Sequence, residues 1–173
     1  MMVMAIVAVV ATVALPNLMQ RMPSYERKAL VTRLNACMAQ VWQQGLVSQK
    51  IQRVTFDIQK RTLVLEQETD QVDPVTQQPV YKEVLAQYAG RVTWPQTFVI
   101  KQFFVQGFDE LTSQQKTDKI WFYLLPAGMA QEVVINLVDT KNAPADQEGK
   151  KMSLVLNPFT VQFKTYDDFQ SPA

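Results

Sequence analysis

Histidine is absent from this 173-residue chain, and cysteine and glycine are scarce, with one and five residues respectively. Without histidine, Ser-His-Asp catalysis, Cys-His pairs and histidine-ligated zinc are excluded. The single cysteine, Cys37, forms no internal disulfide and builds no thiolate metal site. The two common glycine-rich phosphate-binding patterns, GxGxxG and GxxxxGK[ST], do not occur either.

An excess of charge of one sign is also lacking. The chain has 17 basic and 16 acidic residues, for a formal net charge of +1. No global field therefore recruits a polyanion, and we expect no nucleic-acid partner. Hydrophobic residues make up 47% of the chain, which is enough for a core within one compact domain.

The most prominent feature that is present is an apolar run at the N-terminus. Residues 1–15 carry no charge, and Thr12 is their only polar residue. As a helix the run would rise about 22 Å. A helix that crosses a bilayer core needs about 20 residues, so this run is short for a full span. Three interpretations stay open: a buried core helix, a signal peptide cleaved near Thr12-Val13-Ala14, and a membrane anchor whose first residues precede Met1. Helix-compatible residues 17–22 favour the anchor.

A second, amphipathic helix is expected over residues 24–45, after an interruption at Pro23. Ser24 is a suitable N-cap and Gly45 a suitable C-terminal stop. Apolar residues recur on one face at Leu30, Leu34, Cys37, Met38 and Val41, and the opposite face carries Arg27, Lys28, Arg33, Asn35 and Gln43. Cys37 is interpreted as a small buried hydrophobe. We expect strands that carry Phe56, Ile135 and Phe163 to cover the apolar face.

After Gly45 the pattern changes to the alternation of β-strands. A hairpin is expected over 54–67, a polar loop over 69–79, a short helix or irregular edge over 80–88, and a strand over 98–105. Residues 120–125 (IWFYLL) are placed centrally in a sheet because they are apolar on both faces. Val133, Ile135 and Leu137 alternate with positions expected to be more exposed, residues 152–163 form a closing hairpin, and the tail 167–173 is expected to be disordered.

The predicted fold class is therefore α+β. A long N-terminal helix, apolar and then amphipathic, packs on an antiparallel sheet of six or seven strands. Residues 1–22 are assigned to a membrane or filament-core segment, and residues 23–173 to a globular domain.

No group of residues predicts catalysis, so we expect a protein that is not an enzyme and binds no cofactor. Asp167 and Asp168 are interpreted as ordinary acids in a solvated tail. Asp139, Asp146 and Glu148 flank one loop and offer oxygen ligands for calcium, but their spacing matches no EF-hand, and no metal is predicted.

The three tryptophans are interpreted as core filling. They are Trp42, Trp94 and Trp121, and their alternative role is a stacking platform for single-stranded nucleic acid. That alternative is disfavoured because no arginines are interleaved with them.

The stretch MMVMAIVAVVATVALPNL, which ends in Ala14-Leu15-Pro16-Asn17, resembles the N-terminal helix of type IV pilins and type II secretion pseudopilins. The resemblance is strong over the first 18 residues and moderate over the next 30. Residues 47–65, the stretch IWFYLLPAG and the closing strands resemble the globular part of the minor pseudopilin called H. Pro158-Phe159-Thr160 departs from the Thr-Gly turn frequent in such domains.

The resemblance implies a pilin-like fold and a structural role. Such a subunit waits in the inner membrane as a single-pass protein, with its globular domain in the periplasm. It then joins a pseudopilus that exports proteins. The implied partners are other pseudopilins or pilins and the inner-membrane assembly platform. Small side chains at Ala5, Ala8, Ala11 and Ala14 would allow close helix–helix packing, and Pro16 would permit a local bend.

The resemblance also implies residues upstream of Met1. In the family a basic leader ends in a glycine that prepilin peptidase cuts, and a glutamate of the prepilin-type N-terminal methylation motif would lie two residues before Met1. We therefore expect the reading frame to extend upstream.

Two other functions stay open. One is a membrane-tethered or secreted periplasmic binding domain that works as a monomer, and the other is a minor pilin of a type IV pilus. An anchored hydrolase would need a cleft of perturbed acids, which the sequence does not suggest.

Overall fold

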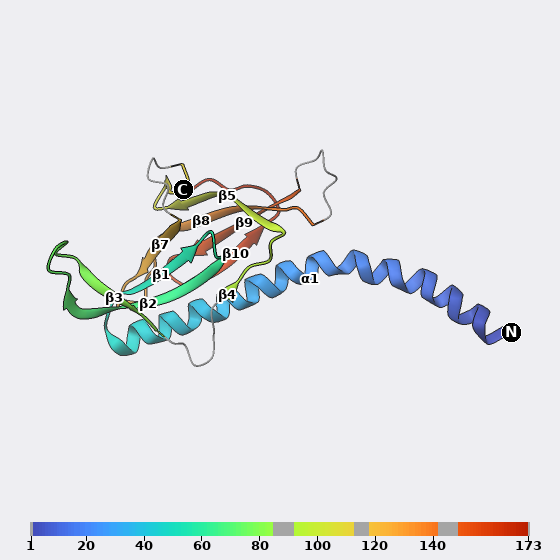
Figure 1. Ribbon diagram of the computed structural model, residues 1–173, viewed down its shortest axis with the longest axis horizontal. Coiled ribbons are helices and arrows are strands. Elements are labelled where there is room, and N and C mark those ends of the chain that lie inside the picture. The colour runs from blue at the N-terminus through green and yellow to red at the C-terminus, as the bar shows by residue number, and fades with distance from the viewer. Residues whose placement is uncertain (1, 85–91, 113–117, 142–148, 173) are drawn as a thin grey trace.

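The computed structural model describes residues 2–84, 92–112, 118–141 and 149–172, with side chains from Tyr25 onward. One long helix, α1 (Met2–Ser48), lies along two antiparallel sheets, and its N-terminal half projects beyond them (Figure 1). The strands are β1 (Gln52–Asp57), β2 (Thr62–Val72), β3 (Pro79–Glu83), β4 (Val92–Thr93), β5 (Phe98–Val105), β6 (Phe108–Asp109), β7 (Lys119–Leu124), β8 (Val133–Asp139), β9 (Lys150–Asn157) and β10 (Gln162–Tyr166). The α+β class is confirmed.

The first sheet has the order β3-β2-β1-β7, with the short β4 also paired to β2. Its β1–β2 hairpin, predicted from the alternation, is confirmed with Asp57 opposite Thr62. Asp57 Oδ1 accepts the backbone N–H of Lys60 (2.8 Å), and Arg61 closes the turn with a φ of 53°. The loop expected over 69–79 is confirmed only over residues 73–78, because β2 continues to Val72 and β3 begins at Pro79.

Strand β7 lies at an edge of this sheet, not in its middle as predicted for residues 120–125. Ile120, Phe122 and Leu124 point into the core, whereas Trp121 is 41% exposed. The apolar run over 120–125 does not indicate a central strand here, because no second layer among the described residues covers its outward-facing Trp121. The cationic side chain of Arg53 lies beside that ring instead. The guanidinium of Arg53 lies 5.8 Å from the ring centre of Trp121.

The second sheet has the order β10-β9-β8-β5-β6. The strand at 98–105 and the closing hairpin β9–β10 are confirmed. The prediction of one sheet with six or seven strands is wrong, since the described strands form two five-stranded sheets. Strand β8 is central and buried on both faces, so the expected exposed positions between Val133 and Leu137 are also wrong.

The expected disorder of the C-terminal tail is wrong for residues 167–172, which pack on the outer face of β8 and β9. The buried side chains of Asn136 and Ser153 hold this segment. Ser153 Oγ donates to the carbonyl of Asp168 (2.8 Å), and the N–H of Gln170 donates to Ser153 Oγ (3.0 Å) and Asn136 Oδ1 (3.2 Å). A polar tail becomes ordered here because it satisfies buried polar side chains.

The helix is one continuous element, so the predicted interruption at Pro23 and the stop at Gly45 are wrong. A proline removes one backbone donor from a helix but does not by itself end it. The predicted apolar stripe is confirmed: Leu30, Leu34, Cys37, Met38 and Val41 are all at most 5% exposed. These side chains share one core with Phe56, Ile135 and Phe163, as expected.

An aromatic cluster lies in this core. Phe56 contacts Phe103 edge to face, with ring centres 5.1 Å apart, and also contacts Trp94 and Phe122. Each of these rings buries a large apolar area, and they belong to the same core as the apolar stripe of α1.

Candidate functional site

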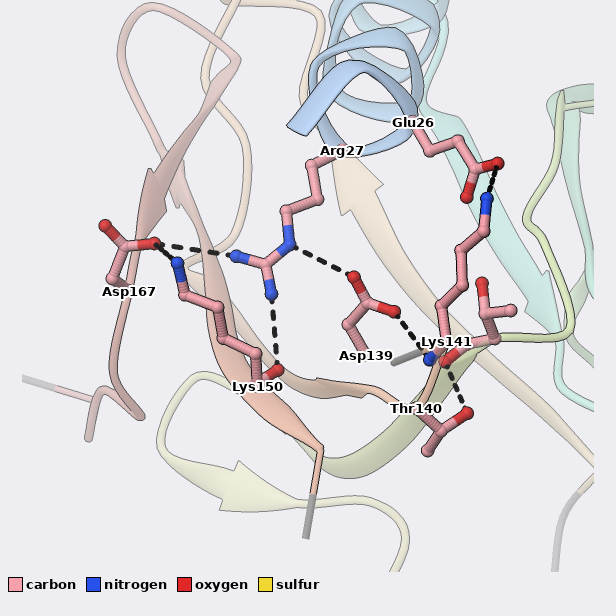
Figure 2. A network of polar contacts seen from close by, with 8 residues as sticks. Glu26, Arg27, Asp139, Thr140, Lys141, Lys150 and Asp167 are labelled. Atoms are coloured by element: carbon pink, nitrogen blue, oxygen red, sulfur yellow. Dashed lines mark hydrogen bonds and ion pairs between the residues drawn. The ribbon is translucent and has the colours of Figure 1, made fainter. Parts of the chain in front are cut away.

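A network of polar contacts surrounds the point where α1 leaves the sheets (Figure 2). We name it the helix-exit network and define it as Glu26, Arg27, Asp139, Lys141, Lys150 and Asp167. Arg27 comes from the helix, Asp139 ends β8, Lys150 begins β9, and Asp167 follows β10. Three strand ends of one sheet thus converge on one turn of the helix.

Arg27 is the centre of this network. Its Nε donates to Asp139 Oδ2 (3.3 Å), its Nη2 donates to the carbonyl of Lys150 (3.4 Å), and its Nη1 lies 3.5 Å from Asp167 Oδ1. The Arg27 and Asp139 side chains are only 13% and 7% exposed, so this pair is shielded from solvent screening. The prediction that Arg27 lies on the face away from the sheets is therefore wrong.

A second ion pair flanks the first. Lys141 Nζ contacts Glu26 Oε1, and the backbone N–H of Lys141 donates to Asp139 Oδ1 (3.1 Å). Thr140 lies between Asp139 and Lys141 in the sequence. Its backbone N–H (2.8 Å) and its hydroxyl (3.0 Å) both donate to the carbonyl of Thr97. Because Asp139 binds both the helix and its own loop, it couples the end of β8 to the position of α1.

Further along the helix, Asn35 holds α1 against strand β10. Its Nδ2 donates to the carbonyl of Phe163 (3.1 Å), and its Oδ1 accepts the N–H of Phe163 (2.7 Å). The side-chain amide thus pairs with the free edge of β10 as a neighbouring strand would. The prediction that placed Asn35 on the outward face is wrong, because periodicity does not distinguish a solvated amide from one paired with a strand edge.

The candidate calcium ligands do not come together in the described residues. Asp139 is engaged by Arg27, while Asp146 and Glu148 lie outside the described residues. Within the described ranges, no group of three or more His, Cys, Asp or Glu residues has a metal-binding arrangement. Asp167, expected to be a solvated acid, is 85% exposed but also pairs with Lys150 (3.7 Å).

Cys37 has the properties of a buried hydrophobe. It is 1% exposed, and burial raises the pKa of its thiol to about 12. A thiol with such a pKa is almost entirely protonated at neutral pH and is a poor nucleophile.

The prediction that the tryptophans fill the core holds only for Trp94, which is 8% exposed. Trp42 is 37% exposed, and its Nε1 donates to the carbonyl of Gly128 (3.0 Å). Trp121 lies beside Arg53 at the surface. An indole that keeps a polar contact is stable at a surface, and periodicity does not predict this.

The predicted assembly residues Ala5, Ala8, Ala11, Ala14 and Pro16 lie on the projecting half of α1, and their side chains are outside those described. Across the residues that the structure describes, no helix has the length and apolarity needed to cross a membrane. The N-terminal half of α1 lies away from the sheets (Figure 1).

Comparison with known proteins identifies the fold. No protein-family model matches the chain, and no curated protein matches it by sequence. Among solved structures, two of the minor pseudopilin EpsH from the type II secretion system of Vibrio cholerae match, each at 13% sequence identity. One covers 85% of this chain and 99% of its own, with a TM-score of 0.53, and the other covers 82% and 95%, with a TM-score of 0.52. The protein therefore has the pseudopilin-like fold that its sequence resemblance implied.

Proposed function

We propose that this protein is a structural subunit of a type II secretion pseudopilus, not an enzyme, and that it assembles through the apolar N-terminal half of α1. The observation that carries the proposal is the division of this helix. Its C-terminal half is fixed to the sheets by the apolar stripe, Asn35 and the helix-exit network, while its N-terminal half projects beyond them (Figure 1).

This division has a mechanical consequence. A force applied along the projecting half is transmitted to the globular domain through side chains that are largely buried and hydrogen-bonded. The Arg27–Asp139 contact lies directly at the exit point and resists rotation of the helix about its axis. A subunit extracted from a membrane by its helix needs such a junction, whereas a tethered binding domain would function with a flexible one.

The composition of the N-terminal residues supports the proposed location. Residues 1–15 are uncharged and apolar, so they are costly to expose to water. We place them in the inner membrane before assembly, with the globular domain in the periplasm. Other pseudopilins and the assembly platform are the proposed partners.

Cysteine crosslinking in cells tests the proposal. A cysteine replaces Ala8 in this chain, and another replaces the matching helix position of a candidate neighbour. A cysteine at the exposed Thr76, on the turn between β2 and β3, is the control. The native Cys37 will not interfere, because it is buried with a raised pKa. Crosslinks at position 8 and none at position 76 are expected, and their absence from secretion-competent cells would exclude the filament role.

The alternative is a monomeric tethered domain, or a minor pilin of a type IV pilus. The crosslinking partner separates these: a pseudopilin supports the proposal, a type IV pilin supports the pilus role, and no partner supports the monomer.

A further inference from the structure

We propose that the outer face of the second sheet is a binding site for an extended peptide segment of another protein, and that the C-terminal tail fills this site as a competing ligand. We name the feature the tail-binding face and define it as Val134, Asn136, Val138, Lys151 and Ser153, which lie on β8 and β9. The site does not involve the apolar half of α1, so the inference goes beyond the proposed function and does not rest on it.

Alternation along the strands places these side chains on one face. The core residues Ile135 and Leu137 alternate with the three members of the face on β8, which therefore point outward. Ser153 lies opposite Asn136 in the pairing of β8 with β9. Although these two polar side chains point away from the core, Asn136 is 1% exposed and Ser153 is 0% exposed. The centre of the face is therefore covered and not solvated.

The tail is bound through its main chain. Asn136 Nδ2 donates to the carbonyl of Gln170 (3.0 Å), and the N–H of Gln170 donates to Asn136 Oδ1 (3.2 Å) and Ser153 Oγ (3.0 Å). Ser153 Oγ donates to the carbonyl of Asp168 (2.8 Å). These four hydrogen bonds all end on backbone atoms of the tail. Because every residue except proline carries both backbone groups, the polar part of the site does not depend on the side chains of the tail.

One side chain of the tail adds a preference. Lys151 Nζ lies 5.2 Å from the ring centre of the half-buried Phe169, which is a cation–π distance. The ligand class is therefore an extended segment with an aromatic residue beside Lys151. The residue after the aromatic one must have a free N–H, so proline is excluded there.

Asn136 and Ser153 are more than is needed to cover a sheet face. Valine at both positions, as at the neighbouring Val134 and Val138, would bury apolar area and leave no polar group to satisfy. The polar pair is instead unfavourable whenever no partner is bound. Asn136 Nδ2 also donates to Gln102 Oε1 (2.7 Å), which holds the amide in the orientation that pairs with a main chain. The face is thus preorganised for a peptide.

The tail is held less firmly than the other main-chain segment that an asparagine binds. Asn35 pairs in the same two-bond manner with Phe163, but Phe163 belongs to β10 and is also held by β9. Residues 167–172 belong to no strand, and Asp167 and Asp168 are exposed. A segment with so few contacts can leave the face without unfolding a sheet.

The tail competes because it is attached to the domain. A short linker gives an effective concentration on the order of millimolar, so a free segment binds only weakly while the tail is in place. Departure of the tail would also withdraw Asp167 from Arg27 and Lys150. Occupation of the face by another segment would therefore reach the helix-exit network.

A second copy of this chain is not the favoured source of the segment. Exchange of tails between two copies would replace each contact by an identical one. The exchange would gain no interaction at this face and would cost the entropy of association. A segment of a different protein is not subject to this balance, because its own contacts can exceed those of the tail.

Peptide binding to the full chain in detergent micelles tests this inference. The probe is a dye-labelled peptide of residues 167–173 (DDFQSPA), and binding is followed by fluorescence anisotropy. Gln170→Pro in the chain removes the N–H that the face binds and should leave the face free, whereas Gln170→Ala keeps that N–H and is the matched control. Without a competing tail, the Gln170→Pro protein should bind the peptide about tenfold more tightly than the wild type or Gln170→Ala.

Further variants define the site. The peptide with Gln170→Ala should still bind the Gln170→Pro protein, and the peptide with Gln170→Pro should not. Asn136→Ala, added to the Gln170→Pro protein, should abolish binding, whereas Gln162→Ala, at an exposed position of β10, should not change it. A chain that ends at Tyr166 removes the tail in a second way and should bind the peptide as the Gln170→Pro protein does.

Equal binding to the wild type, Gln170→Ala and Gln170→Pro would overturn the inference. So would the absence of binding to both tail-free variants, or equal binding of the peptide that carries proline. Light scattering distinguishes the source of the segment, and the wild type should show no association that depends on the tail. A wild-type dimer that Gln170→Pro converts to a monomer would make a second copy the ligand and would also overturn the inference.

Discussion

Removal of the Asn35 side chain should weaken the docking of the helix more than its half-exposed position suggests. In Asn35→Ala the N–H and the carbonyl of Phe163 both lose their partner at a residue that is 4% exposed. A buried hydrogen bond contributes about 0.5–1.5 kcal/mol net, and a buried group left unsatisfied costs about 1–3 kcal/mol. Alanine returns up to about 0.7 kcal/mol through its higher helix propensity.

The expected net loss is therefore about 2 kcal/mol of the free energy of unfolding. For a domain of this size that corresponds to about 4–8 °C in the melting temperature. The assay is urea and thermal unfolding, followed by circular dichroism, of the fragment that begins at Ser24, which we expect to be soluble and monomeric. Gln43→Ala, on an exposed position of the same helix, is the matched control and should be neutral.

A second substitution at the same position makes the test specific. Asn35→Asp keeps the acceptor for the N–H of Phe163 but turns an oxygen toward its carbonyl, so at neutral pH it should cost at least as much as Asn35→Ala. If both variants unfold within about 0.5 kcal/mol of the Gln43→Ala control, the amide does not fix the helix to β10.

Four further outcomes are expected from the same fragment. Leu34→Asp, which puts an uncompensated charge into the core, should cost about 3–5 kcal/mol in urea unfolding, while the neighbouring exposed Arg33→Asp should change little. The Cys37 thiol, with a pKa raised to about 12 by burial, should not react with a thiol reagent at pH 8 until urea unfolds the domain; rapid reaction in the folded state would contradict this. Asp139→Asn should lower stability by about 1.5–3 kcal/mol because it removes the buried charge partner of the helix arginine. Asp70→Asn, whose carboxylate is fully exposed and has its pKa lowered by a surface lysine, should leave the unfolding midpoint unchanged.

How far the sequence predicts the fold depends on whether a pattern is local. The stripe of Leu30, Leu34 and Met38 was identified correctly because helical periodicity and burial coincide in a helix that packs on one side. The hairpins were identified for the same reason. Strand β7 was misplaced because an apolar run has the same composition at an edge as in the centre of a sheet.

Helical periodicity does not predict where the polar residues of the candidate site lie. Arg27 and Asn35 occupy positions that periodicity assigns to solvent, but strand ends and a strand edge meet them there. Their partners Asp139 and Phe163 lie more than 100 residues away in the chain. No local signal indicates such a pairing.

By itself, the sequence determined the α+β class, the apolar stripe of the helix, the buried state of Cys37 and the exclusion of histidine chemistry. These follow from composition and from short-range periodicity, which act within a few residues of the chain. Only the tertiary structure decided that there are two sheets, that the C-terminal tail is ordered on Asn136 and Ser153, and that Arg27 joins three strand ends at the helix exit. The physical reason is that a buried polar group is stable only beside its partner, and the fold brings the partner from a distant part of the chain.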